Sequence, residues 1–205
     1  SLRQCRGLLA AVRAATLDQR AVILPAAQAK MMAVVPGSRV TAAEDLLSAC
    51  GLIKAKTLAV IKVKAGTTST QKPESTTQIT GQEVAKRALE IAAAGGHHLL
   101  MIGPPGAGKT LLAASLPPLL EDPSPSAQLE LSLMRDLLGL EPNSGRPFRA
   151  PHHSTTAAGL VGGGINATPG EVSLAHGGVL FLDELAEFRG TVLDLLRQPL
   201  ESGHI

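Results

Sequence analysis

The stretch LLMIGPPGAGKT, residues 99–110, decides the fold of this chain. Its first part, Leu99–Ile102, is wholly apolar, which is typical of a short strand buried on both faces of a parallel sheet. The second part, residues 103–110, fits the phosphate-loop pattern G-x-x-x-x-G-K-[ST], and a helix is predicted from Lys109 to Leu116. A strand, a glycine loop and a helix in this order predict an α/β fold that binds phosphate groups at the start of the helix.

Each part of the loop has an expected task at a nucleotide. The glycines let successive backbone N–H groups turn toward phosphate oxygens, and the start of the helix adds unpaired N–H groups. Lys109 would neutralise the β- and γ-phosphates, and the Thr110 hydroxyl would ligate Mg²⁺. The predicted nucleotide-binding residues of the loop are Gly103, Pro104, Pro105, Gly106, Ala107, Gly108, Lys109 and Thr110.

A second apolar strand, which ends in two carboxylates, follows further along the chain. The sequence VLFL at Val179–Leu182 is predicted as this strand, and Asp183 and Glu184 come directly after it. Asp183 is expected to reach the Mg²⁺ ion held by Thr110, and Glu184 to polarise the water that attacks the γ-phosphate. With Lys109 and Glu184 as the catalytic residues, the two motifs together predict hydrolysis of Mg–ATP.

The composition excludes several classes of protein. Three Phe are the only aromatic residues, which argues against modules that stack single-stranded bases on aromatic side chains. Two cysteines are too few for a disulfide scaffold, and the sequence shows no secretory signal peptide. No apolar run approaches the ~18 residues that a membrane helix needs. We therefore expect a soluble, cytoplasmic protein that does not contact a membrane.

Charge and composition divide the chain into three predicted parts. Residues 1–66 carry ten Lys and Arg against three Asp and Glu, whereas the rest of the chain carries nine against fourteen. This split indicates either two units with different tasks or merely a solvated basic surface. Residues 67–78, which read TTSTQKPESTTQ, are polar and aperiodic and are predicted to be a linker. The third part, residues 79–205, contains both phosphate-site motifs.

Local signals within residues 1–66 predict helices and strands, among them the following. A buried strand is expected at Ala21–Leu24, ended by Pro25. Thr41, with Glu44 three residues on, is a candidate capping box for the helix that follows. The segment 57–63 alternates loosely and is flanked by lysines, which is typical of an edge strand protected against pairing with other chains.

Further motifs surround the two phosphate-site motifs. They are GQE at 81–83, AGGHH at 94–98, RPFRAPHHS at 146–154, GGG at 162–164, PGEVSLAH at 169–176, LAEF at 185–188 and LRQPLE at 196–201. Together they make residues 79–205 similar to the magnesium-chelatase-like AAA-plus ATPases of the ComM/YifB type. The resemblance implies a partial P-loop AAA-plus parallel sheet with flanking helices, and ATP and Mg²⁺ as cofactors.

The resemblance also implies a function and partners. These are a homo-hexameric ring in the bacterial cytoplasm and a helicase activity on branched DNA during natural transformation. Two alternatives stay open. One is a chelatase-type subunit that remodels a metal-inserting partner, and the other is a chain that at most binds nucleotide.

The resemblance places several residues outside the two motifs. Ile79 and Gln82 occupy the segment that closes over adenine in this class, where Ile79 would supply an apolar contact. Residues 1–66 look like the closing portion of a Lon-protease-like α/β domain. Gly7 stands where those proteases have a catalytic lysine, so proteolysis is not expected.

Family members continue beyond the position of Ile205 into a strand with a sensor asparagine, an arginine finger and a helical lid. We therefore expect the chain to be truncated before the sensor and the lid. In the family, the sensor strand separates the phosphate-loop strand from the strand that ends in the acids. Leu99–Ile102 and Val179–Leu182 are thus not expected to pair directly, and Asp183 is expected to lack a fixed distance from Thr110.

Three segments allow more than one interpretation. His97 and His98 are either loop residues or metal ligands, although no Cys or acidic partner stands at ligand spacing. The pair His152 and His153 could belong to a plain loop, contact DNA or another subunit, or bind a metal. The glycine-rich segment 159–170 is either a flexible connector or a moving loop that contacts substrate in the pore of a ring.

Overall fold

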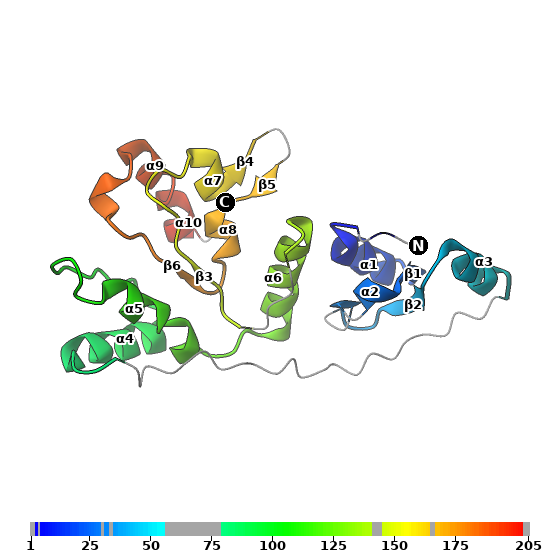
Figure 1. The fold of residues 1–205 in the computed structure, drawn as a ribbon, viewed down its shortest axis with the longest axis horizontal. Helices are drawn as coiled ribbons and strands as arrows, with labels where there is room; N and C mark the ends of the chain where they lie inside the picture. Colours follow the sequence, from blue (N-terminus) through cyan, green and yellow to red (C-terminus); the bar gives the residue numbers. More distant parts are fainter. Residues whose placement is uncertain are drawn as a thin grey trace. The chain divides into compact units, whose positions relative to one another are not determined.

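The computed structural model describes residues 3, 5–29, 31–32, 35–55, 79–140, 145–164 and 167–202. The chain forms two compact units, Ser1–Ser69 with Ser124–Asn143 and Thr70–Pro123 with Ser144–Ile205 (Figure 1). The predicted edge strand at 57–63 and the predicted linker at 67–78 lie outside the described residues. None of the described helices combines the length and the apolar character that crossing a membrane requires.

The first unit is built on two parallel strands. Their residues pair in register from Ala21 with Arg39 to Pro25 with Ala43, and the strand predicted at Ala21–Leu24 is thereby confirmed. The described elements of this unit are α1 (Leu8–Leu17), β1 (Ala21–Pro25), α2 (Ala26–Ala29), β2 (Arg39–Ala43), α3 (Leu46–Ala55) and α6 (Pro125–Leu137). Helix α6 comes from the part of the sequence predicted to belong with the phosphate site, and the predicted domain bounds stay a prediction.

Apolar side chains from both strands and from α1 form the core of the first unit. The buried members of this core are Leu9, Val12, Leu24, Met32, Val35 and Val40. Leu129 and Leu133 of α6 pack against it. The buried carboxylate of Asp136 in α6 accepts a hydrogen bond of 2.7 Å from the backbone N–H of Leu9. One of the unpaired N–H groups at the start of α1 is thereby satisfied from another helix.

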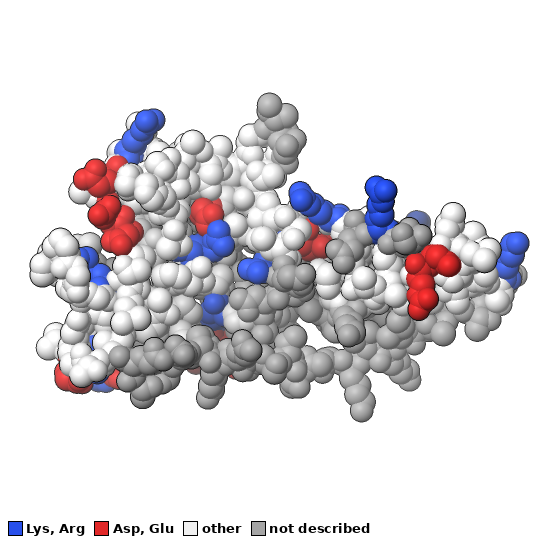
Figure 2. All heavy atoms as spheres, in the orientation of Figure 1, with Lys and Arg blue, Asp and Glu red and all other residues white. Residues whose placement is uncertain are grey.

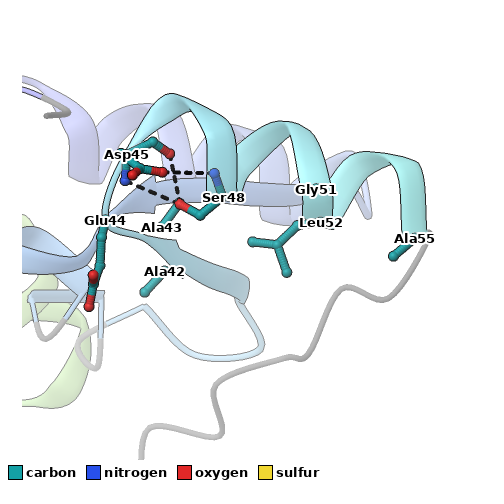
Figure 3. A pocket seen from close by; sticks show the side chains of 8 residues that line it. All are labelled: Ala42, Ala43, Glu44, Asp45, Ser48, Gly51, Leu52 and Ala55. Carbon is teal, nitrogen blue, oxygen red and sulfur yellow. Dashed lines mark hydrogen bonds between the residues drawn. The ribbon is translucent and has the colours of Figure 1, made fainter.

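The helix after β2 starts at a different residue from the one predicted. Thr41 lies within β2 with 4% of its surface exposed, so the predicted capping box of Thr41 and Glu44 is wrong. Instead, the Asp45 carboxylate accepts a 2.8 Å hydrogen bond from the N–H of Ser48, and this bond, followed by the Ser48 hydroxyl, lowers the pKa of Asp45. An N-cap carboxylate is favoured here because it pairs with an N–H group that the helix itself leaves free. Figure 3 shows this cap at the edge of a shallow pocket between β2 and α3.

The second unit carries the two phosphate-site motifs. Its described elements are α4 (Glu83–Gly95), α5 (Lys109–Ala114), the 3₁₀ helix η3 (Pro117–Leu119), β3 (Phe148–Arg149), α7 (Ala157–Val161), β4 (Gly162–Gly163), β5 (Thr168–Pro169), α8 (Glu171–Leu174), β6 (Val179–Leu180), η4 (Leu185–Glu187), α9 (Gly190–Asp194) and α10 (Arg197–Ser202). Strands β3 and β6 are parallel, whereas β4 and β5 form an antiparallel hairpin. Both units therefore have an α/β fold with small parallel sheets.

Two small apolar clusters hold the second unit together. Ile79, Leu89 and Leu112 form one of them, which joins α4 to α5. The other consists of Leu160, Val192 and Leu196, and it joins α7 to α9 and to the residue just before α10. The phosphate-loop helix and the strand with the acids thus belong to different clusters.

The apolar run before the phosphate loop differs from its prediction. Leu99–Ile102 is not a strand in the structure, and 71% of Leu100 and 90% of Ile102 are exposed. Among the described residues, no strand pairs with this run. The run and β6 do not pair directly, as expected, and β6 pairs with β3 instead. An apolar segment without a neighbouring strand has no surface on which to bury its side chains, and this is the physical reason for the difference.

Basic side chains do not gather into one patch on the face drawn in Figure 2. The described Lys and Arg side chains on that face are scattered between neutral ones and form no continuous basic patch. The sequence-level split in charge therefore does not translate into a single basic surface in this view.

Candidate active site

The phosphate loop has the backbone that its glycines allow. Gly106 and Gly108 have φ angles of +76° and +80°, a region that residues with a Cβ rarely adopt. Helix α5 begins at Lys109, directly after Gly108. The predicted loop and its helix are therefore present as local structure, although the run before them is not a strand.

The Lys109 side chain contacts the first residues of its own loop. Its Nζ donates hydrogen bonds of 3.0 Å to the carbonyl oxygens of Gly103 and of Pro104. The ammonium group is thereby held close to the loop backbone, which is the position from which it could neutralise a bound phosphate.

The structure brings the two predicted Mg²⁺ ligands together. The Thr110 hydroxyl donates a 3.2 Å hydrogen bond to Oδ2 of Asp183 across 73 residues of sequence. The other carboxylate oxygen of Asp183 accepts a 2.9 Å hydrogen bond from the N–H of Glu184. This arrangement differs from the expectation that Asp183 would lack a fixed distance from Thr110. A hydroxyl beside a carboxylate is a set of hard oxygen donors, which fits Mg²⁺.

Glu184 lies in a turn between β6 and η4. Its φ of +51° is unusual for a residue with a side chain, and it turns the chain sharply after the strand. The side chain is 69% exposed, and its Oε2 lies 3.8 Å from Nδ1 of His153. A carboxylate in this open position is accessible to water, as the predicted role requires.

The two histidines after β3 form a pair. Their rings lie 4.0 Å apart between centroids, and Nδ1 of His152 accepts a 3.3 Å hydrogen bond from the N–H of Ser154. The described residues contain no group of three or more His, Cys, Asp or Glu side chains that could hold a metal ion. The metal interpretation of this pair therefore has no support, and His153 is instead a neighbour of Glu184.

The two residues predicted to lie near adenine have different surroundings. Ile79 is 8% exposed and packs in the cluster with Leu89 and Leu112. Gln82 is exposed, and its Nε2 donates a 2.7 Å hydrogen bond to the carbonyl oxygen of Ala107 in the phosphate loop. Their contact with a base stays a prediction.

The glycine-rich segment is an ordered hairpin where it is described. A Cβ on Gly170 would overlap the backbone nitrogen of Gly162, so the two arms approach as closely as only glycine allows. Directly after the hairpin, Glu171 pairs with Arg149 of β3 through two hydrogen bonds of 2.6 and 2.7 Å. This pairing raises the pKa of the Arg149 guanidinium. A role of the hairpin in contacting substrate stays a prediction.

Sequence reasoning missed three of these contacts. Neither the Arg149–Glu171 pair, nor His153 beside Glu184, nor the tether from Gln82 to the loop was predicted. Arg149 and Glu171 both lie in quoted motifs, so they were candidates, but no local pattern indicates which residues of two distant motifs meet.

Comparisons with known proteins bear on this site. Residues 75–205 match the family model described as magnesium chelatase, subunit ChlI. The chain is 43% identical over 213 residues to the competence protein ComM of Haemophilus influenzae, a match that covers 100% of this chain and 42% of that protein. It is 40% identical over 209 residues to the uncharacterized protein YifB of Escherichia coli, covering 100% of this chain and 41% of that protein. The chain thus spans well under half the length of these relatives.

A protease is also among the similar proteins. Lon protease 2 of Bacillus subtilis is 30% identical over 144 residues, which is 63% of this chain and 26% of the protease. This share is larger than residues 1–66 alone could supply, so the likeness is not confined to the predicted Lon-like part.

Proposed function

We propose that this chain, which belongs to the magnesium chelatase, subunit ChlI family, is a Mg²⁺-dependent ATPase of the AAA-plus class. Within that family the chain is of the ComM/YifB type. The observation that carries the proposal is the 3.2 Å contact between the Thr110 hydroxyl and the Asp183 carboxylate. This contact joins the phosphate loop to the strand with the acids, and these are the two motifs that such an enzyme needs side by side.

Each residue of the site has its own proposed role in binding the nucleotide, holding Mg²⁺ or activating water. Backbone N–H groups of the loop and the Lys109 ammonium would bind the phosphates, because they supply positive charge in the ground state. Thr110 and Asp183 would hold Mg²⁺, which when bound neutralises charge on the β- and γ-phosphates. Glu184 would orient the attacking water and accept its proton.

The fold in which these residues act is part of the proposal. The parallel pair of β3 and β6 would be two neighbouring strands of the AAA-plus sheet, with Phe181 and Leu182 between the end of β6 and the acids. Residues 1–66 would be the closing portion of a Lon-like domain, a proposal that rests on the sequence resemblance of this segment. Proteolysis is not proposed, because Gly7 has no side chain that could act in it.

The action of the whole protein is proposed from its relatives. The similarity of the full chain to a protein named for competence supports a role in competence. The finer proposal, a ring-shaped, hexameric motor on branched DNA, is what the family resemblance of the sequence implies. Its match to a magnesium chelatase model favours, as the second candidate, a subunit that remodels a metal-inserting partner. Stimulation of hydrolysis by branched DNA in the full-length protein would support the first candidate, and no stimulation by any DNA would exclude it.

The test of the ATPase site compares ATP binding with and without Mg²⁺. In the full-length protein we expect Thr110→Val and Asp183→Asn to lose most of the gain in ATP affinity that Mg²⁺ gives the unchanged protein. Asp194→Asn, at an exposed carboxylate of α9, is the matched control and should keep that gain. If Mg²⁺ strengthens ATP binding equally in all four proteins, the proposed metal ligands are wrong.

A further inference from the structure

We propose that Gln82 is a positioning residue that fixes one peptide group of the phosphate loop, and that it acts on the phosphates of the nucleotide rather than on its base. The inference rests on the proposed function, because it concerns the same loop. The observations behind it do not involve Asp183 or Glu184, since they are contacts of Gln82 with the loop and of α4 with α5.

The backbone of Gln82 has an unusual and well-defined conformation. Gln82 is the N-cap of α4, with φ of 55° and ψ of 42°. A residue with a side chain occupies this left-handed region only where its surroundings determine it, and such residues gather at functional sites. Gln82 holds this conformation where its side chain reaches the loop.

The amide of Gln82 contacts the end of the loop. Its Nε2 lies 2.7 Å from the carbonyl oxygen of Ala107, which is a short hydrogen bond between a neutral donor and a neutral acceptor. A Cβ built on Gly108 would lie 3.6 Å from the same Nε2, so the amide also packs beside the next residue. The contact thus covers the peptide group between Ala107 and Gly108.

Fixing this carbonyl also fixes a neighbouring N–H group. The peptide between Ala107 and Gly108 is trans, so its C=O and the N–H of Gly108 point in opposite directions. When Gln82 holds the carbonyl, the N–H of Gly108 must point away from Gln82, in the opposite direction within the same peptide plane. The N–H of Ala107 is also engaged, because it donates a 3.3 Å hydrogen bond to the carbonyl of Pro104. Both peptide groups around Ala107 are therefore held.

Both ends of the tether are anchored. Helix α4 is joined to α5 by the buried contact of Leu89 with Leu112, and Ile79 packs in the same cluster. Gln82 therefore reaches the loop from a segment that is packed against the helix that the loop begins. Ile79 is 8% exposed, which leaves little of its side chain for a stacked base.

The loop is thus held by side chains at its start and at its end. Lys109 donates to the carbonyls of Gly103 and Pro104, and Gln82 donates to that of Ala107. The Gln82 tether orients a backbone N–H before any nucleotide binds, and such preorganisation lowers the cost of binding. Because the oriented group is a phosphate ligand, the benefit does not depend on which base the nucleotide carries.

The experiment measures the affinity of the full-length protein for ATP, GTP and inorganic tripolyphosphate. Gln82→Leu removes the amide at similar size. We expect it to weaken all three ligands by the same factor, up to about tenfold, as for one neutral hydrogen bond. Gln82→Asn keeps an amide, tolerates the left-handed conformation and is one methylene too short to reach Ala107. It should show the same loss with an unchanged melting temperature, which keeps the test valid if Gln82→Leu folds poorly.

The control and a second readout separate positioning from general damage. Gln19→Leu is matched, because Gln19 is exposed and has a φ of 56°, and it should leave all three affinities unchanged. In the NMR spectrum of the ligand-free protein, Gln82→Asn should shift the amide signal of Gly108 and leave that of Leu89 in α4 in place.

The outcomes distinguish this inference from the proposed function. A loss confined to ATP would show that Gln82 reads adenine, and unchanged affinities for all three ligands would show that the tether has no effect; either result overturns the inference and leaves the ATPase proposal standing. An unchanged protein that binds none of the three ligands would overturn the ATPase proposal, and the inference with it.

Discussion

The two units of this chain are held together in different ways. In the first unit, β1 and β2 pair over five residues each, and their side chains enter a core with several members that are almost fully buried. In the second, β3 and β6 pair over two residues each, and the apolar run before the phosphate loop is exposed. Besides its two small apolar clusters, the second unit has side-chain hydrogen bonds from Thr110, Gln82 and Arg149 that join segments at and near the candidate site.

The two units are therefore expected to respond differently to substitutions. Apolar burial stabilises a fold without demanding particular partners, so the first unit should respond to loss of buried volume. The candidate site depends on named polar atoms, so the second unit should respond in binding and turnover before it responds in stability. The predictions below test this contrast, beginning with the largest expected effect.

The largest effects should come from the two catalytic candidates of the second unit. Lys109→Ala should abolish ATP binding, because it removes the cation that offsets phosphate charge in the ground state. Glu184→Gln should keep ATP binding and lower turnover by about 10²-fold or more, because it removes the base and not the phosphate ligands. Both are measured in the full-length protein, by titration calorimetry and by release of phosphate.

Lys86→Ala is the control for this pair of substitutions. Lys86 lies on α4 and pairs at 3.1 Å with Glu83, which is not a residue of the loop, so its loss should leave ATP affinity unchanged. Unchanged ATP affinity in Lys109→Ala would show that the loop does not bind phosphate, and the contrast between the units would lose its basis.

The next effect compares the same substitution in the two units. Leu24→Ala removes a side chain that is 2% exposed in the core of the first unit and should destabilise it by about 2–5 kcal/mol. Leu100→Ala removes a side chain that is 71% exposed and should change the free energy of unfolding of this chain by less than about 0.5 kcal/mol. Chemical denaturation of the 205-residue chain measures both. Equal losses would mean that the apolar run before the loop is buried after all.

The sequence predicted the local parts of this architecture well. The phosphate loop, its helix, the strand at Ala21–Leu24 and the acids after β6 were each recognisable from a contiguous pattern. The burial of Leu99–Ile102 was predicted wrongly, because an apolar pattern states that a segment prefers to be buried and does not state which strand will cover it. Pairing is a property of two segments, whereas the pattern belongs to one.

The contacts that assemble the site were beyond local patterns for a related reason. Thr110 and Asp183 were predicted as ligands of one ion, yet Gln82 on Ala107 and His153 beside Glu184 were not predicted as contacts. Each joins side chains from distant segments, and many residues of similar chemistry lie in those segments. Only the folded backbone selects among them.

A smaller effect is expected at the ion pair between β3 and α8. Arg149 and Glu171 meet through two hydrogen bonds, with 33% and 23% of their side chains exposed. Arg149→Lys keeps the charge and cannot make both bonds, so we expect a loss of roughly 0.5–1 kcal/mol, reduced by the partial exposure. Arg87→Lys is the matched control, because Arg87 pairs with Glu90 at an exposed position and its change should have no measurable effect. Identical denaturation curves for Arg149→Lys and the unchanged chain would place this pair among ordinary surface contacts.

The smallest effect is expected at the start of α3, in the first unit, and it depends on pH. The Ser48 N–H lowers the pKa of Asp45 from its usual 3.8, so the ionised carboxylate is favoured by folding. The unfolded chain binds the proton at higher pH than the folded chain does. The stabilisation by Asp45 is therefore fully present above the unfolded pKa and is lost as the pH falls below 3.8 through the lowered folded pKa. Asp45→Asn keeps a good N-cap and removes the titration, so it isolates this contribution.

Denaturation of the unchanged chain and of Asp45→Asn, each measured from pH 7 down to about pH 2.5, gives the test. The advantage of the aspartate over the asparagine in the free energy of unfolding should be small at neutral pH and should shrink further below pH 3.8. Thr41→Val, measured beside it, should have no pH-dependent effect, since Thr41 lies in β2 and does not cap the helix. If instead the difference between the unchanged chain and Asp45→Asn stays constant over this range, the carboxylate is not the group that starts α3. Asp45 would then make no pH-dependent contribution to the stability of the first unit, and apolar burial would account for more of that stability.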